Sequence, residues 1–295
     1  MKISSLLAGG RTHFSFEFFP PKNDEDVDRV LATARELKAL KPAYISVTWG
    51  AGGSTRRKTL DIVSAVKNEI GIETMAHLTC VGAAREEIDG VLEDIHRRGV
   101  ENILALRGDP PKGADAFVPH PQGFQHANEL VAHIRKRWDF CLGVAGYPEG
   151  HLECPDKEKD LDHLKRKVDS GADFIVTQLF FNNDDFFRFR DRAAARGIRQ
   201  PIVAGLMPIT NFGQLQRFTT LCGAKIPTAL AARLEAIQED AEAVIRLGID
   251  YAAAQCRELM AGGVPGIHFY TLNRSRSTSE ILRRLQSENR PPSKP

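Results

Sequence analysis

Glu17 is the residue in this chain best placed for acid–base chemistry. It lies in an aromatic stretch that ends at two prolines, residues 14–21. Alternation along a strand puts the phenylalanines on one face and Glu17, with Ser15, on the other. If the phenylalanines pack beneath helices, Glu17 points inward, where loss of water disfavours its charged form and lets it donate a proton near neutral pH. The structural alternative is an inward glutamate paired with a lysine or arginine.

Two further polar residues lie at or near the carboxyl ends of predicted strands. Asp109 comes after Arg107 and Gly108 and before two prolines. A carboxylate there could oppose a cationic intermediate or accept a ligand N–H, or it could simply pair with an arginine. Gln178 carries both a donor and an acceptor, which suits the edge of an amide-like heterocycle, although a turn-stabilising amide is the alternative.

A third set of candidates follows the fifth predicted strand. Asp160, Arg166 and Lys167 lie on one predicted helix, where the arginine fork and the lysine charge could bind phosphates or a ribose. A solvated helix face is the alternative reading. His77, His151 and His163 are weaker candidates singly, since an isolated histidine often has only a structural role.

These residues require a fold that brings strand ends together. Eight short β-branched or aromatic segments alternate with amphipathic helical segments. The predicted strands are His13 to Phe18, Ala43 to Trp49, Glu73 to Thr79, Asn102 to Arg107, Phe140 to Ala145, Asp173 to Phe180, Pro201 to Leu206 and Ile267 to Tyr270. The predicted helices are Asp24 to Leu40, Arg56 to Ile70, Ala83 to Arg98, Phe124 to Trp138, Lys157 to Ser170, Asp184 to Arg196 and a set from Asn211 through Met260.

This alternation predicts an α/β fold, a single (β/α)8 TIM barrel over residues 1–295, with a flexible tail from about residue 288. The site would then lie on the loops at the carboxyl ends of the strands. Two such loops are long, residues 108–123 and 146–155, and the first could form a lid. An open doubly wound sheet is the competing architecture, but the eight units and the absence of a GxGxxG turn favour the barrel.

Composition narrows the function classes. Lys and Arg total 40 against 38 for Asp and Glu, a formal net charge of +2, so a nucleic-acid partner is not indicated. No segment resembles a secretory signal or a membrane span, and we expect a cytoplasmic protein. The five cysteines form no CxxC pair, and no His and Cys cluster has zinc-ligand spacing, so we expect reduced thiols and no metal.

The motifs also resemble a known family. The matching segments, in chain order, are residues 16–22 (FEFFPPK), 47–55 (VTWGAGGST), 106–109 (LRGD), 146–151 (GYPEGH), 164–172 (LKRKVDSGA), 177–181 (TQLFF), 205–209 (GLMPI) and 269–274 (FYTLNR). Together they resemble the methylenetetrahydrofolate reductases, and the resemblance extends from Phe14 to Arg274. Eight motifs in order make a chance match improbable.

The resemblance implies a flavin barrel that uses FAD and reduces 5,10-methylenetetrahydrofolate to 5-methyltetrahydrofolate. NADH or NADPH would reduce the flavin and leave before the folate enters, a ping-pong mechanism. Glu17 would be the general acid that helps open the five-membered ring of the folate to an iminium. Asp109 would lie by the flavin and the pterin and stabilise that cation.

Binding residues also carry over from the family. Those for folate would be Asp109, Gln178, Gln214, Tyr270 and Arg274, and those for the nicotinamide nucleotide would be Thr48, Gln178 and Phe218. Those for FAD would be Trp49, Ala51, His77, Arg107, Gly108, Asp109, Ala127, Tyr147, His151, Asp160, His163, Arg166 and Lys167.

This chain departs from the family pattern at two of these positions. Trp49 stands where bacterial members often have Tyr, and His163 where Asn is common, so the hydrogen bonds made there are open. We expect no appended regulatory domain, no control by S-adenosylmethionine, and a homo-oligomer. Two other readings remain: a flavin- or folate-binding subunit that receives electrons from a partner protein, and a barrel with unrelated lyase chemistry.

Overall fold

The fold is a closed barrel of eight parallel strands. The computed structural model describes residues 1–49, 55–110 and 117–288 of the chain. The strands are hydrogen-bonded in chain order, and β8 closes the barrel against β1. They are β1 (His13–Phe18), β2 (Tyr44–Val47), β3 (Thr74–Thr79), β4 (Asn102–Leu106), β5 (Cys141–Gly146), β6 (Phe174–Thr177), β7 (Ile202–Leu206) and β8 (Gly266–Tyr270). The predicted (β/α)8 barrel is therefore confirmed.

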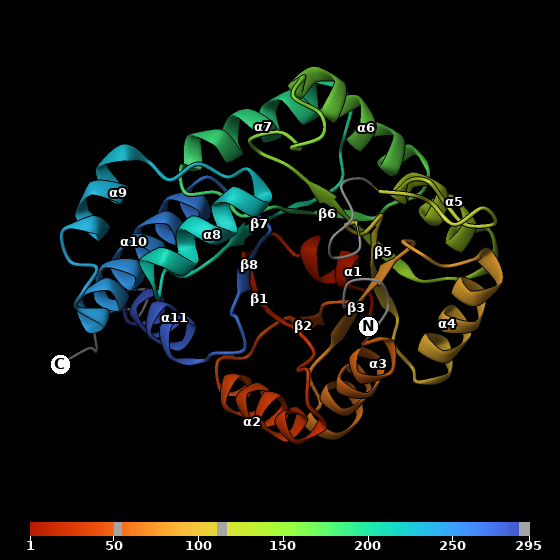
Figure 1. Ribbon diagram of the computed structural model, residues 1–295, viewed down its shortest axis with the longest axis horizontal. Coiled ribbons are helices and arrows are strands. Elements are labelled where there is room, and N and C mark those ends of the chain that lie inside the picture. The colour runs from red at the N-terminus through yellow and green to blue at the C-terminus, as the bar shows by residue number, and fades with distance from the viewer. Residues whose placement is uncertain (50–54, 111–116, 289–295) are drawn as a thin grey trace.

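Helices surround the barrel, as Figure 1 shows. They are η1 (Asp24–Asp26), α2 (Val27–Lys38), α3 (Arg56–Ala65), η3 (Val66–Ile70), α4 (Arg85–Arg97), α5 (Ala127–Arg137), α6 (Lys157–Asp169), α7 (Asn183–Ala195), α8 (Phe212–Cys222), α9 (Thr228–Glu235), α10 (Ala241–Ala261) and α11 (Arg276–Glu288). The set predicted after Asn211 resolves into α8, α9 and α10. Gly223 ends α8 in the left-handed conformation, and Asp240 caps the first turn of α10.

The two faces of β1 have different environments, as the alternation predicts. Phe16 and Phe18 are fully buried in the main apolar cluster between the strands and the helices. Glu17 faces the interior of the barrel, where it lies close to His77 of β3 and His268 of β8. The hydrophobic effect on the outer face thus fixes the direction of the carboxylate.

A short helix, α1 (Ile3–Leu7), was not among the predicted elements. Ile3 and Leu7 are buried in a second apolar cluster that includes Tyr44 and Phe174 from the strands. The backbone N–H of Ile3 donates to Oδ1 of Asn102 at 2.8 Å, and Asn102 is fully buried at the start of β4. The helix therefore packs against the amino-terminal ends of the strands, opposite the predicted site.

Some predicted bounds were wrong. The predicted strands 43–49 and 173–180 end earlier, at Val47 and Thr177. The N–H of Gln178 still donates to the carbonyl oxygen of Gly146, but that of Leu179 donates to the side chain of Gln178 instead. The other predicted strand bounds agree to within one residue. The last helix, α11, also lay outside the predicted set, although Ile281, Leu282 and Leu285 on it are buried.

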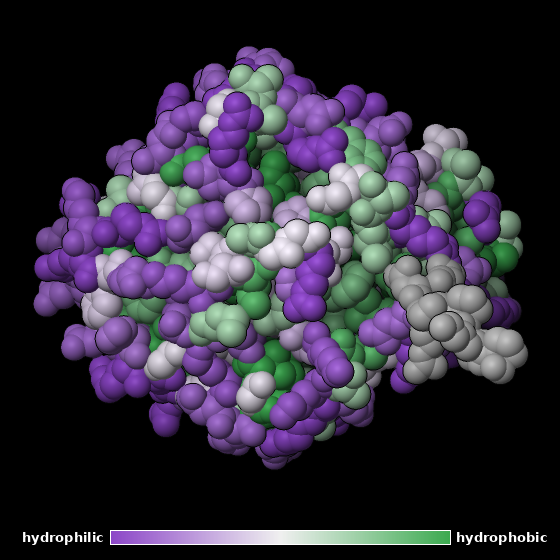
Figure 2. Space-filling model, turned by 180° about the vertical axis from the view of Figure 1, so that it is seen from behind, coloured by the Kyte–Doolittle hydropathy of each residue, from purple (hydrophilic) through white to green (hydrophobic). Residues whose placement is uncertain are grey.

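The face seen from behind in Figure 2 is mostly hydrophilic, with apolar residues in small separate areas. Within the described ranges, no helix is both long and apolar enough to span a membrane. The predicted tail lies outside the described residues, apart from residue 288 at the end of α11.

Candidate active site

Glu17 lies between two buried histidines inside the barrel. Its Oε2 atom is 3.4 Å from Nε2 of His77 and 3.7 Å from Nε2 of His268. Burial lowers the pKa of His77 to about 4; the neighbouring carboxylate opposes this shift and His268 adds to it. His77 is therefore neutral near pH 7, and its buried Nε2 has no hydrogen-bond partner within the described part of the chain. The imidazole of His77 is thus desolvated, yet one of its nitrogens lacks a hydrogen-bond partner.

His268 is held from both ring nitrogens. Nδ1 lies 2.7 Å from the hydroxyl of Ser15, and Nε2 lies 3.1 Å from the hydroxyl of Ser46. All three side chains are fully or almost fully buried, and the ring of Tyr44 stacks on the imidazole at 5.6 Å between centroids. Sequence reasoning missed His268. The signal that could have found it is alternation along β8, which puts His268 and Tyr270 on the inward face.

Tyr270 is fixed beside Glu17. Glu17 and Tyr270 are register partners on β1 and β8, and the tyrosine hydroxyl donates to the carbonyl oxygen of Thr177 at 2.6 Å. Gly205 makes this close approach possible, because a Cβ built there would lie 2.2 Å from that carbonyl oxygen and 2.6 Å from the tyrosine hydroxyl. Three strand ends thus converge beside the carboxylate.

A pocket of about 290 Å³ opens between the ends of β4 and β5, the first turn of α5, and one side of α6 along most of its length. Eight residues predicted to bind FAD line it: Arg107, Ala127, Tyr147, His151, Asp160, His163, Arg166 and Lys167. The structure therefore brings together a large part of that predicted set. Glu17 and His77 are not in the pocket wall and form a separate group in the barrel interior.

Arg107 is held in place on one side of the pocket. Its two terminal nitrogens contact the two carboxylate oxygens of Glu153 at 2.5 and 2.7 Å. The guanidinium also lies 4.7 Å from the ring centre of Phe117. The backbone turn beneath it needs Gly108, which has a φ of 89° and whose Cβ would lie 2.7 Å from Val81. The left-handed conformation of Gly108 thus sets the turn that precedes Asp109.

Lys167 supplies a partly buried cation to the same pocket. Its ammonium donates to the carbonyl oxygen of Ala145 at 2.5 Å and lies 5.8 Å from the ring centre of Tyr147. Burial lowers the pKa of Lys167 to about 8, with Asp160 acting in the opposite direction. Burial also raises the pKa of Asp160 and lowers that of His151. A bound anion would therefore favour the charged form of this lysine.

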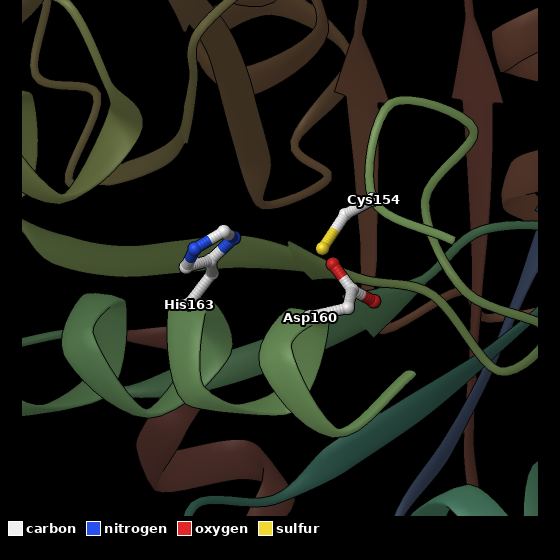
Figure 3. Close-up of side chains that lie close together, drawn as sticks. All are labelled: Cys154, Asp160 and His163. Atoms are coloured by element: carbon white, nitrogen blue, oxygen red, sulfur yellow. The ribbon is translucent and has the colours of Figure 1, made fainter. Parts of the chain in front are cut away.

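Three potential metal ligands meet in the same pocket. One ligand atom each from Cys154, Asp160 and His163 lies within 4.8 Å of the others. Figure 3 shows Cys154 and Asp160 close together, with His163 further along α6. The cations Arg166 and Lys167 line the same pocket, which favours an anion over a metal ion there. The absence of a metal stays a prediction.

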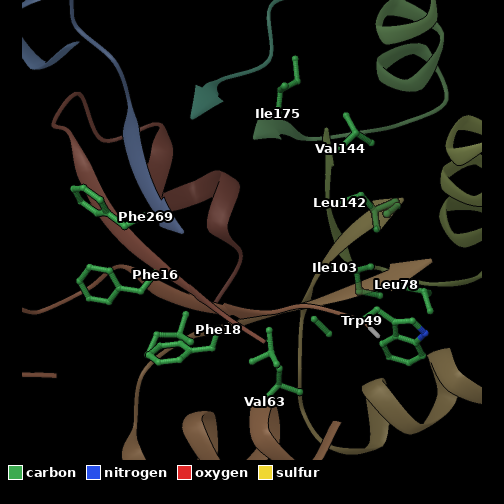
Figure 4. Close-up of a cluster of buried hydrophobic side chains, with 14 of the residues drawn as sticks. Phe16, Phe18, Trp49, Val63, Leu78, Ile103, Leu142, Val144, Ile175 and Phe269 are labelled. Atoms are coloured by element: carbon green, nitrogen blue, oxygen red, sulfur yellow. The ribbon is translucent and has the colours of Figure 1, made fainter. Parts of the chain in front are cut away.

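Trp49 does not line this pocket. It is 8% exposed, it belongs to the main apolar cluster, as Figure 4 shows, and its ring lies 5.9 Å from the guanidinium carbon of Arg56. Thr48 and Gln178 lie just beyond β2 and β6, where their backbone N–H groups donate to Phe18 and Gly146 on neighbouring strands. Both therefore stand at the predicted mouth of the barrel.

The predicted folate and nucleotide residues on later elements are more scattered. Gln214 and Phe218 lie on α8, and Phe218 packs against the same apolar cluster as Tyr270. Arg274 and Asp109 are exposed on the loops after β8 and β4. Ala51 lies outside the described residues.

The fold and site together define a (β/α)8 barrel with a cationic pocket at the carboxyl ends of its strands, the face that carries the active site in such barrels. Residues 2–286 match the family model described as Methylenetetrahydrofolate reductase. The chain belongs to this family.

Its relatives carry the same description. It is 45% identical over 295 residues to "Methylenetetrahydrofolate reductase (NADH) 1" of Arabidopsis thaliana, and the match covers 96% of this chain and 50% of that protein. It is 37% identical over 276 residues to the 5,10-methylenetetrahydrofolate reductase of Pectobacterium carotovorum subsp. carotovorum, covering 94% of this chain and 91% of that protein. The chain thus spans about half the length of the plant relative and most of the bacterial one.

A solved structure supports the fold alone. A protein from Clostridium thermocellum, described as binding two copies of 5-methyl-5,6,7,8-tetrahydrofolic acid, superimposes with a TM-score of 0.66 at 15% identity. The match covers 98% of this chain and 100% of that one.

Proposed function

We propose that this protein reduces 5,10-methylenetetrahydrofolate to 5-methyltetrahydrofolate, with FAD as its cofactor and NADH or NADPH as the electron donor in a ping-pong mechanism. The observation that carries the proposal is the position of Glu17, a carboxylate held beside two buried histidines inside a barrel of this family. The name of the plant relative includes NADH, which makes NADH the first donor to test.

The pocket residues fit the anionic part of FAD. Arg107, Arg166 and Lys167 supply positive charge, and the ring of Tyr147 offers an apolar wall. Arginine and lysine are the side chains that bind phosphate oxygens best. The unpartnered Nε2 of His77 marks a second place where a ligand could complete a hydrogen bond. The three cations would hold the diphosphate and ribose portions, and His77 would supply one further hydrogen-bonding group.

FAD held by these residues would supply the hydride-transfer chemistry between the nicotinamide and the folate. The chain's own residues would do the proton chemistry. Glu17 would donate a proton to the ring nitrogen of the folate as its five-membered ring opens to an iminium. Asp109, exposed at the end of β4, would oppose the positive charge of that cation.

Orientation of the substrates would come from several strand ends. Tyr270, whose hydroxyl is fixed on Thr177, presents its ring at the mouth of the barrel beside Glu17. Gln178 would hydrogen-bond first to the nicotinamide and later to the edge of the pterin. A ping-pong reaction permits this because the two ligands do not bind together. Gln214 and Phe218 on α8 and Arg274 after β8 would complete the folate and nucleotide contacts.

The proposal is tested by an anaerobic absorbance trace of the purified protein. NADH or NADPH is added first and 5,10-methylenetetrahydrofolate second. Bleaching of the flavin band followed by its return supports both half-reactions. A colourless protein that FAD cannot reconstitute would overturn the proposal, and a yellow protein that neither nucleotide bleaches would instead support electron supply by a partner protein.

A further inference from the structure

Glu153 and Asp160 place carboxylates on the wall of a pocket that also presents Arg107, Arg166 and Lys167, and Glu153 is the one paired with Arg107. Its two carboxylate oxygens lie 2.5 and 2.7 Å from the two terminal nitrogens of Arg107. Arginine binds phosphate through the same two-point geometry. Glu153 therefore occupies the arginine in the way that a phosphate ligand would.

Arg107 keeps its orientation through contacts that do not involve Glu153. Its Nε donates to the carbonyl oxygen of Gly108 at 3.2 Å, and its guanidinium lies 4.7 Å from the ring centre of Phe117. The arginine side chain is only 20% exposed. Loss of Glu153 would therefore leave the guanidinium in place, with its two terminal nitrogens free for another anion.

Glu153 itself can leave at small cost. It lies on the loop between β5 and α6, and its side chain is 52% exposed. The hydrogen bond from Arg107 lowers the pKa of Glu153, so the carboxylate stays charged near neutral pH. Ion pairs with one partner this open to solvent contribute little to stability, because water replaces the lost contact.

We propose that Glu153 is a built-in competitor for phosphate, which occupies Arg107 in the flavin-free protein and releases it when a diphosphate group enters the pocket. The inference rests on the proposed function where it names FAD as that ligand. The same competition would apply to any other diphosphate that binds to Arg107 in this pocket. Glu153 thus sets the affinity for the cofactor without contributing a contact to it.

The test uses the full chain freed of flavin. FAD binding is measured by fluorescence quenching and ADP binding by calorimetry, for the wild type, E153Q and E153A. The matched control is E158Q, which removes the same charge from an exposed glutamate on α6 that pairs with Arg192 and Arg196 outside the pocket. We expect both Glu153 variants to bind FAD and ADP roughly three- to tenfold more tightly, and E158Q to match the wild type.

The R107Q background tests whether Arg107 is the group for which Glu153 and the phosphate compete. In R107Q the gain from E153Q should shrink, since the shared partner is gone, and thermal unfolding reports whether each variant is folded. Binding by E153Q and E153A that equals or falls below the wild type would overturn the inference, because the ion pair would then persist in the complex. If the wild type binds ADP but not FAD, tighter ADP binding by E153Q would support the competitor while the flavin assignment fails.

Discussion

The Oε2 atom of Glu17 on β1 lies 3.7 Å from Nε2 of His268 on β8, and the imidazole is held by the hydroxyls of Ser15 and Ser46. Neighbouring strands thus position the carboxylate through a chain of buried polar groups. Such a network stabilises one arrangement when all its members are paired.

Replacement H268A should therefore loosen Glu17 and destabilise the barrel. It leaves two buried hydroxyls without this partner, which we expect to cost about 1–3 kcal/mol of unfolding free energy. Chemical denaturation measures the loss, and the rate of folate reduction should fall while nucleotide oxidation changes less. H133A, which removes a partly buried histidine paired with Asp89 far from this network, is the control. Equal effects of both variants on the two half-reactions would argue against positioning of Glu17.

Replacement G205A should disturb Tyr270. The added Cβ would lie 2.2 Å from the carbonyl oxygen of Thr177 and 2.6 Å from the tyrosine hydroxyl, so one of them must move. Overpacking of this kind costs about 1–3 kcal/mol, and the KM for folate should rise with the displaced ring. G213A has its nearest neighbour at 3.6 Å and should leave both stability and KM almost unchanged. A G205A variant with wild-type KM would exclude Tyr270 from the folate site.

The affinity for FAD should depend on pH through Lys167. Loss of water lowers the pKa of this partly buried lysine to about 8, so it is charged below that pH and neutral above it. Anion binding favours the charged form, and FAD binding to the flavin-free protein should therefore weaken as pH rises through about 8. K167M should weaken binding and flatten the profile. K165M removes a lysine that pairs with Asp169 outside the pocket, and it should keep the wild-type pH dependence. A wild-type affinity that does not change with pH would contradict the role of Lys167.

The sequence predicted the barrel and the direction of Glu17 because one physical rule governs both. Alternation along β1 separates Phe16 and Phe18 from Glu17, and burial of the phenylalanines leaves the carboxylate only the interior. The pocket residues Arg107 and Lys167 followed from their places after β4 and within α6, which the order of elements determines.

Other features could not be read from the sequence because they depend on contacts between distant segments. The pairing of Arg107 with Glu153 joins two loops, and the packing of α1 under the barrel depends on Asn102, about a hundred positions away. His268 looks like an ordinary strand residue until Ser15 and Ser46 are placed beside it. The low exposure of Trp49 likewise reflects its neighbours in the folded cluster and not its own type.

The role of Glu17 as the proton donor for folate reduction is tested by the two half-reactions of E17Q, measured by anaerobic stopped flow. We expect bleaching of the flavin band by the nicotinamide nucleotide at nearly the wild-type rate. Its return on addition of 5,10-methylenetetrahydrofolate should be slower by about 10²- to 10⁴-fold. E158Q, with the same change on an exposed glutamate, should behave as the wild type in both. Folate reduction by E17Q at the wild-type rate would show that Glu17 is not the proton donor.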